Sequence, residues 1–113
     1  MMWACSLVHR LDRGTTGCLV LARTADAARQ LSELFETHQI RKTYLALCLG
    51  VPTEDQGQMR SFIADGLVNG VGRMSVVSAT ARGAQLAITD YKILAQSSFQ
   101  SSLIQLSPLT GRR

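Results

Sequence analysis

The chain has 113 residues, so it forms one domain or part of one. Hydrophobic residues make up 46% of it and charged residues 18%, a composition that excludes a disordered chain. The 12 Lys and Arg against 8 Asp and Glu give a net charge of +4, which favours a polyanionic partner only mildly.

Two further features of the composition concern the compartment. No apolar run approaches the roughly 20 residues that span a bilayer, and the N-terminus lacks the regions of a signal peptide. The three cysteines are odd in number and contain no Cys-x-x-Cys spacing, which is typical of free thiols in a reducing compartment. We therefore expect a soluble, cytoplasmic protein without membrane contact, with an organellar location as the alternative.

The first part of the chain predicts one strand and one helix. Residues 18–22 are continuously apolar and follow a turn-rich segment, which predicts a short buried strand. Thr24 is a suitable helix N-cap, and Asp26 suits the first turn that follows. Apolar residues then recur at helical spacing, which predicts an amphipathic helix over about residues 25–37.

The remainder of the chain predicts strands. Residues 43–49 form an apolar run with Pro52 only beyond it, which predicts a central strand. Further strands are expected at residues 58–64, 74–77, 84–94 and 102–106, joined by a polar turn at 53–57, a glycine-rich loop or hairpin at 65–72 and a loop at 78–83. One early helix followed by strands with short connections predicts an α+β fold with a mixed or mostly antiparallel sheet.

The segment from His9 to Gly17 places one carboxylate, Asp12, between Arg10 and Arg13. An acid flanked by cations tends to stay ionised, so Asp12 could act as a nucleophile or base while the arginines hold a phosphodiester backbone. Taken alone, such an aspartate is more often a solvated loop residue in a weak surface ion pair. A lone histidine such as His9 is likewise more often a packing or hydrogen-bonding residue than a ligand.

Two other segments carry candidate functional residues. Arg41, Lys42 and Tyr44 place two cations and an aromatic ring at the start of a strand, and residues 106–112 lead from a strand into a basic turn ending at Arg112. Taken alone, Arg41 and Lys42 could belong to a solvated connection, and Tyr44 could be a core tyrosine with a satisfied hydroxyl. Arg112 could belong to a basic tail. No metal site is expected, because neither histidine has Cys or carboxylate partners at ligand spacing.

Together and in this order, the three segments resemble the motifs of the RluA family of pseudouridine synthases. Residues 9–17 resemble the pattern HRLD-x-x-[TS]-[TS]-G, and residues 42–46 and 106–112 resemble the two later motifs. Residues 73–77 are similar to an arginine-methionine strand common in the family. The resemblance runs from about Leu7 to Arg112 and implies that residues 1–113 form part of a pseudouridine synthase catalytic domain.

The resemblance also implies an activity, the isomerisation of uridine to pseudouridine in RNA, with large-subunit ribosomal RNA as the substrate class and no cofactor. Asp12 would be the catalytic carboxylate, as a nucleophile at C1′ or a base at C2′. Tyr44 would stack on the target uracil and could assist proton transfer at C5. Arg10 would fill the space of the extruded base. The expected phosphate contacts are Arg13, Arg41, Lys42, Arg73 and Arg112.

The sequence departs from the family pattern in two places. Gly14 stands where the family often has an acid, which predicts a looser catalytic turn. The chain also ends at Arg113, before the arginine that pairs with the catalytic aspartate in the family, and begins almost at the first motif. We therefore expect a monomeric fragment that is poorly stable and nearly inactive. The alternatives are a catalytically inactive RNA-binding fragment of the same fold and a fragment without function.

Overall fold

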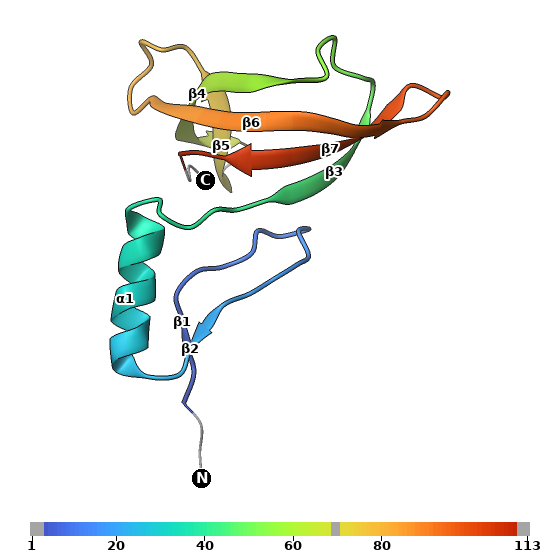
Figure 1. Ribbon diagram of the computed structural model, residues 1–113. Coiled ribbons are helices and arrows are strands. Elements are labelled where there is room, and N and C mark those ends of the chain that lie inside the picture. Colours follow the sequence, from blue (N-terminus) through green and yellow to red (C-terminus); the bar gives the residue numbers. More distant parts are fainter. Residues whose placement is uncertain (1–3, 69–70, 111–113) are drawn as a thin grey trace. The chain divides into compact units, whose positions relative to one another are not determined.

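A computed structural model describes residues 4–68 and 71–110 of the chain (Figure 1). The chain divides into two compact units, Met1–Ile40 and Arg41–Arg113, and each is described by itself. Within the described ranges, no helix is long and apolar enough to cross a membrane.

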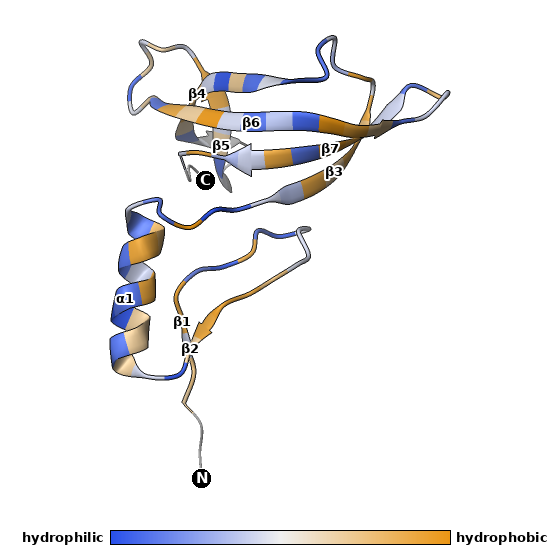
Figure 2. Ribbon diagram, in the orientation of Figure 1, coloured by the Kyte–Doolittle hydropathy of each residue, from blue (hydrophilic) through white to orange (hydrophobic). Residues whose placement is uncertain are grey.

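The first unit consists of a two-stranded ladder and the helix. Strands β1 (Ser6–Leu7) and β2 (Leu21–Ala22) pair antiparallel, and helix α1 (Ala25–Glu36) follows directly. The hydroxyl of Thr24 accepts a hydrogen bond from the backbone N–H of Ala27 at 3.0 Å, which satisfies one of the free donors of the first turn. In Figure 2 the apolar residues of α1 follow one side of the helix and the hydrophilic residues the other. The capped, amphipathic helix is therefore confirmed.

The second unit is one antiparallel sheet of five strands in the order β3-β7-β6-β4-β5 (Figure 1). The strands are β3 (Tyr44–Leu49), β4 (Gln56–Val68), β5 (Val71–Val77), β6 (Gln85–Gln96) and β7 (Ser101–Pro108). All pairs of strands are antiparallel, and the register of β6 against β7 shifts between Ile93 and Ala95. The predicted α+β class with a mostly antiparallel sheet is confirmed.

Few side chains are fully buried. Among the residues whose burial is described, the buried apolar ones are Ala64 on β4 and Ile104 on β7 in the second unit and Ala22 in the first. Ser102 is also buried, and its hydroxyl donates to the carbonyl of Gly50 at 2.8 Å, so this polar group is satisfied. Cys5, Cys18 and Cys48 are free thiols.

Two predictions about apolar runs are wrong. Within residues 18–22 only Leu21–Ala22 is a strand, and Leu19, Val20 and Leu21 are exposed instead of buried. Residues 43–49 do not form a central strand, because β3 lies at an edge of the sheet and pairs with β7 alone among the described strands. Both runs are apolar although neither is covered on both faces. An apolar run therefore does not by itself distinguish a buried central strand from an exposed or edge strand.

The remaining strands are present but longer than predicted. β4 begins at Gln56, inside the predicted turn, and continues to Val68, while β5 begins at Val71. Of the segment predicted as a loop or hairpin at 65–72, residues 69–70 lie outside the described residues, and the rest is paired in the β4–β5 ladder, with Gly66 opposite Arg73 and Gly72 opposite Leu67. Backbone hydrogen bonding across the pair holds these glycines in strand geometry, although glycine is disfavoured there on its own.

Candidate active site

Asp12 lies in the loop that joins β1 to β2. Its backbone carbonyl accepts a hydrogen bond from the N–H of Thr15 at 3.0 Å, which closes a turn over Arg13 and Gly14. Gly14 has φ +85°, in the left-handed region where only glycine avoids strain. The residue that departs from the family pattern therefore stands at a backbone position that favours glycine.

The carboxylate of Asp12 is exposed, as are the side chains of Arg10 and Arg13 on the same loop. In residues 4–68 and 71–110 the one ion pair joins Asp26 to Arg29 on α1, so Asp12 pairs with neither flanking arginine. Asp12 is therefore a solvated loop residue, without the weak surface ion pair of the alternative interpretation among the described residues. All three charged groups remain available to a ligand.

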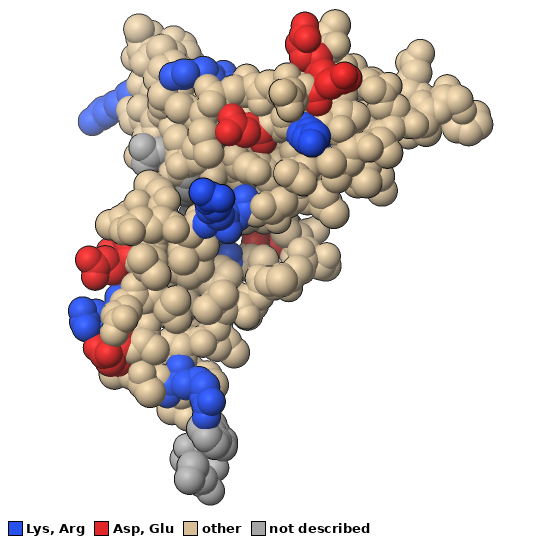
Figure 3. Space-filling view, in the orientation of Figure 1, with Lys and Arg blue, Asp and Glu red and all other residues tan. Residues whose placement is uncertain are grey.

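On the face shown in Figure 3, Lys and Arg side chains occur on both units, and within neither unit do they gather into one patch. The net charge of +4 is therefore not focused on this face, and phosphate binding would depend on a few individual cations.

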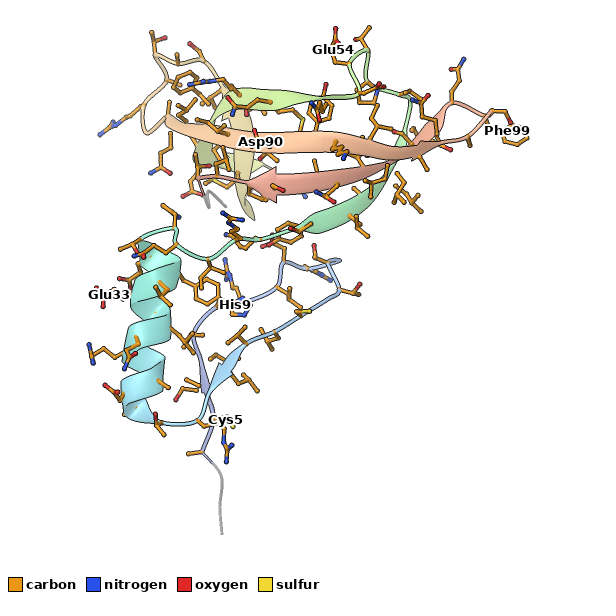
Figure 4. All side chains as sticks on the ribbon, in the orientation of Figure 1. Cys5, His9, Glu33, Glu54, Asp90 and Phe99 are labelled. Atoms are coloured by element: carbon orange, nitrogen blue, oxygen red, sulfur yellow. The ribbon has the colours of Figure 1, made fainter. Side chains whose placement is uncertain are left out.

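His9, labelled in Figure 4, is fixed by two contacts inside the first unit. Its Nε2 accepts a hydrogen bond from the backbone N–H of Val20 at 2.8 Å. Its ring stacks on Phe35 of α1, with ring centroids 4.5 Å apart and an interplanar angle of 17°. His9 is thus a packing and hydrogen-bonding residue. Phe35 is one of the apolar residues of the predicted helix, and nothing in the sequence indicated its contact with His9.

Tyr44 begins β3 in the second unit and is half-buried. It lies opposite Leu106 on β7, which lies opposite Tyr91 on β6, so the three side chains share one face of the sheet. Tyr91 donates its hydroxyl hydrogen to the carbonyl of Glu54 at 3.3 Å. Within the described residues of this unit, nothing hydrogen-bonds the Tyr44 hydroxyl. The satisfied hydroxyl of the alternative interpretation is therefore found at Tyr91, which is also half-buried and which sequence reasoning missed, and no described residue of the second unit supplies a partner for Tyr44.

The candidate phosphate contacts of the second unit fall in two places. Exposed Arg41 and half-buried Lys42 directly precede Tyr44 and therefore lie beside it. Arg73 is exposed on β5, at the opposite edge of the sheet from β3, opposite Gly66. Four strand spacings separate the two edges, on the order of 20 Å along the sheet. Arg112 lies outside the described residues.

The described part of the chain holds no group of three or more His, Cys, Asp or Glu residues that could bind a metal ion. Asp12 belongs to the first unit and Tyr44 to the second, so each is described within its own unit.

Comparison with known proteins gives consistent matches. The family model described as RNA pseudouridylate synthase matches residues 4–113. The mitochondrial pseudouridylate synthase RPUSD4 of Bos taurus is 36% identical over 121 residues, covering 93% of this chain and 32% of the relative. The ribosomal large subunit pseudouridine synthase C of Rickettsia bellii (strain RML369-C) is 33% identical over 108 residues, covering 94% of this chain and 34% of the relative.

Solved structures agree with these sequence matches. The structure titled Human RNA Pseudouridylate Synthase Domain Containing 4 superposes with a TM-score of 0.78 at 37% identity, covering 96% of this chain and 43% of that one. The chain thus spans about a third of the length of these curated relatives and less than half of this solved chain.

Proposed function

Because the chain belongs to the RNA pseudouridylate synthase family, we propose that it isomerises uridine to pseudouridine in RNA, with Asp12 as the catalytic residue. The observation that carries this proposal is the exposed carboxylate of Asp12, free of any ion pair within the described residues, on a loop between two exposed arginines. A carboxylate in that setting can approach a sugar carbon while cations beside it contact the RNA backbone.

The reaction needs no co-reactant, because uridine and pseudouridine are isomers. The bond between N1 of uracil and C1′ of ribose breaks, the base turns, and C5 bonds to C1′. The proton lost from C5 is balanced by one gained at N1. Asp12 would open the sequence either as a nucleophile at C1′ or as a base at C2′.

Tyr44 would bind the displaced uracil. Its hydroxyl is not used by any described residue of its own unit, and its ring begins an edge strand with Arg41 and Lys42 directly before it. An aromatic ring in this position can stack on a base, and a phenol can assist proton transfer at C5.

RNA binding would rest on the individual cations. The target base must leave its stack, which costs a few kcal/mol, and Arg10 would fill the vacated space. Phosphates would be contacted by Arg13, Arg41, Lys42, Arg73 and Arg112. We further propose ribosomal RNA as substrate, which the name of the Rickettsia bellii relative supports. The mitochondrial name of the Bos taurus relative supports the organellar alternative to the cytoplasmic location expected from the sequence.

The proposal is tested by tritium release from RNA carrying 5-³H-uridine. The chain is compared with Asp12→Asn and with Asp26→Asn, a control that changes an exposed aspartate of α1 already paired with Arg29. We expect slow but measurable release by the unmodified chain and the Asp26 variant, in keeping with the low activity expected from the sequence, and none by the Asp12 variant, with equal RNA affinity for all three. Equal binding without release by any of them would favour an inactive RNA-binding protein instead. Absence of RNA binding would remove both functions.

A further inference from the structure

We infer that His9 is a positioning residue for Asp12, acting as a side-chain clamp across the base of the loop at residues 10–19. This inference rests on the proposed function for its catalytic consequence. The clamp itself is defined by contacts within the first unit: the hydrogen bond from the Val20 N–H and the stack on Phe35.

The clamp begins where the backbone ladder stops. β1 and β2 pair Ser6 with Ala22 and Leu7 with Leu21, and the ladder extends no further toward the loop. Beyond this point the N–H of Val20 donates to Nε2 of His9 at 2.8 Å instead of to a backbone carbonyl. One side chain thus supplies the next connection between the two arms of the loop, which lowers the conformational freedom of the ten-residue segment that it closes.

The hydrogen bond selects the tautomer of the neutral ring. An imidazole nitrogen that accepts a hydrogen bond carries no proton, so the neutral ring must hold its proton on Nδ1. The assignment follows from the hydrogen-bond partner, since Val20 N–H can only donate.

Phe35 fixes the plane of the same ring. It lies in the last turns of α1, and its ring is nearly parallel to that of His9, with centroids 4.5 Å apart. His9 is half-buried by this packing. The helix therefore sets the ring orientation, and the ring orientation aims Nε2 at the β2 side of the loop.

The clamp restricts Asp12 because the two residues are close in the chain. Only Arg10 and Leu11 separate them, so Asp12 can lie at most about 11 Å from the fixed Cα of His9. On its other side Asp12 is tied into a turn by the Thr15 N–H at 3.0 Å. A released clamp would leave that turn on a flexible loop, and a small misplacement of a catalytic group lowers turnover strongly.

The first test uses the unmodified chain and no activity. Two-bond nitrogen–proton spectra of the His9 ring report its tautomer at neutral pH. We expect the proton on Nδ1, and a proton on Nε2 would overturn the clamp. This measurement needs no variant and is independent of whether the chain modifies RNA.

The second test compares His9→Leu, which has no acceptor, with His9→Gln, whose Oε1 can replace Nε2. His38→Asn is the matched control, because His38 is the other histidine and is exposed with φ 56°, which Asn tolerates. We expect amide exchange at Val20 and Thr15 to speed up at least tenfold in His9→Leu and to change much less in His9→Gln and His38→Asn. Unchanged exchange at Thr15 in His9→Leu would overturn the positioning of Asp12.

The third test links the clamp to catalysis. In the tritium-release assay we expect His9→Leu to lower kcat at least tenfold with RNA affinity unchanged, and His9→Gln to restore most of the rate. A full rate in His9→Leu would overturn the positioning role. If the unmodified chain releases no tritium, the proposed function fails, while the tautomer and the exchange at Thr15 still decide the clamp.

Discussion

The ring of Tyr91 lies against Gly57 on the neighbouring strand. The two residues are directly opposed in the β4–β6 ladder, and a Cβ built on Gly57 would lie 3.1 Å from both Cε1 and the hydroxyl oxygen of Tyr91. The same hydroxyl donates to the Glu54 carbonyl just before β4. The missing side chain of Gly57 thus gives the Tyr91 ring the space to reach that carbonyl.

Replacing Gly57 by alanine should therefore destabilise the second unit. The ring would have to shift by a few tenths of an ångström and weaken its bond to Glu54, and overpacking of this kind costs on the order of 1 kcal/mol in free energy of unfolding. Chemical denaturation measures the change. Gly66→Ala is the control, because Gly66 lies on the same strand with nothing within 4 Å of its Cβ position. Equal stability of the two variants would contradict this role of Gly57.

The sequence predicted best those elements whose own residues show a clear hydrophobic period or a capping residue. α1 has a capping threonine and apolar residues at helical spacing, and its observed limits Ala25–Glu36 differ by one residue from the prediction. β1 escaped prediction because a two-residue strand has no period. The edge position of β3 depends on the order of strands in the sheet, which no local pattern contains.

For the candidate site too, the sequence predicted features that depend on local residues and missed contacts between distant residues. The sequence placed Asp12 on a loop and Tyr44 at a strand start, because turn residues and an apolar run mark those positions. It could not show that His9 binds Val20 and stacks on Phe35, since these contacts join three separate parts of the first unit. The sequence also could not show whether Asp12 forms a surface ion pair, since that depends on side-chain placement in the loop, and among the described residues it forms none.

Capping by Thr24 should contribute measurably to the first unit. Thr24→Ala removes the acceptor of the Ala27 N–H, which typically costs about 1 kcal/mol. Helical circular dichroism during thermal unfolding measures the loss, and Thr24→Ser, which keeps the hydroxyl, should be close to the original chain. If alanine and serine behave alike, the cap does not stabilise α1.

The exposed leucines of β3 should promote self-association, in contrast to the monomer expected from the sequence. Leu45, Leu47 and Leu49 alternate along this edge strand and are 64%, 85% and 99% exposed. An edge strand without charged side chains exposes unpaired backbone groups and apolar surface, and a second copy of the chain can pair with both. Sedimentation velocity measures this association. As the protein concentration rises, the average sedimentation coefficient should increase less for Leu47→Lys than for the unmodified chain. Phe99→Lys is the control, because Phe99 is about as exposed as Leu47 but lies outside the strands. This change should not reduce association.

Two variants of Tyr44 should separate stacking from proton transfer. Tyr44→Phe keeps the ring, so RNA affinity should hold while the rate of tritium release falls by about 10²-fold or more, as for loss of a general acid or base. Tyr44→Leu should also weaken RNA binding, because stacking on a base is worth about 1–3 kcal/mol. Tyr91→Phe is the control, since its hydroxyl already donates to Glu54. An unchanged rate for Tyr44→Phe would limit Tyr44 to stacking.

Salt dependence should reveal how far the RNA extends over the sheet. Arg41 adjoins Tyr44, whereas Arg73 lies on the opposite edge strand. Each lost phosphate contact lowers the slope of log affinity against log salt by about 0.7 for single-stranded RNA. We expect that decrease for both Arg41→Gln and Arg73→Gln and none for Arg29→Gln, because Arg29 pairs with Asp26 on α1. A decrease for Arg41→Gln alone would mean that the bound RNA ends before β5, and it would remove Arg73 from the binding surface.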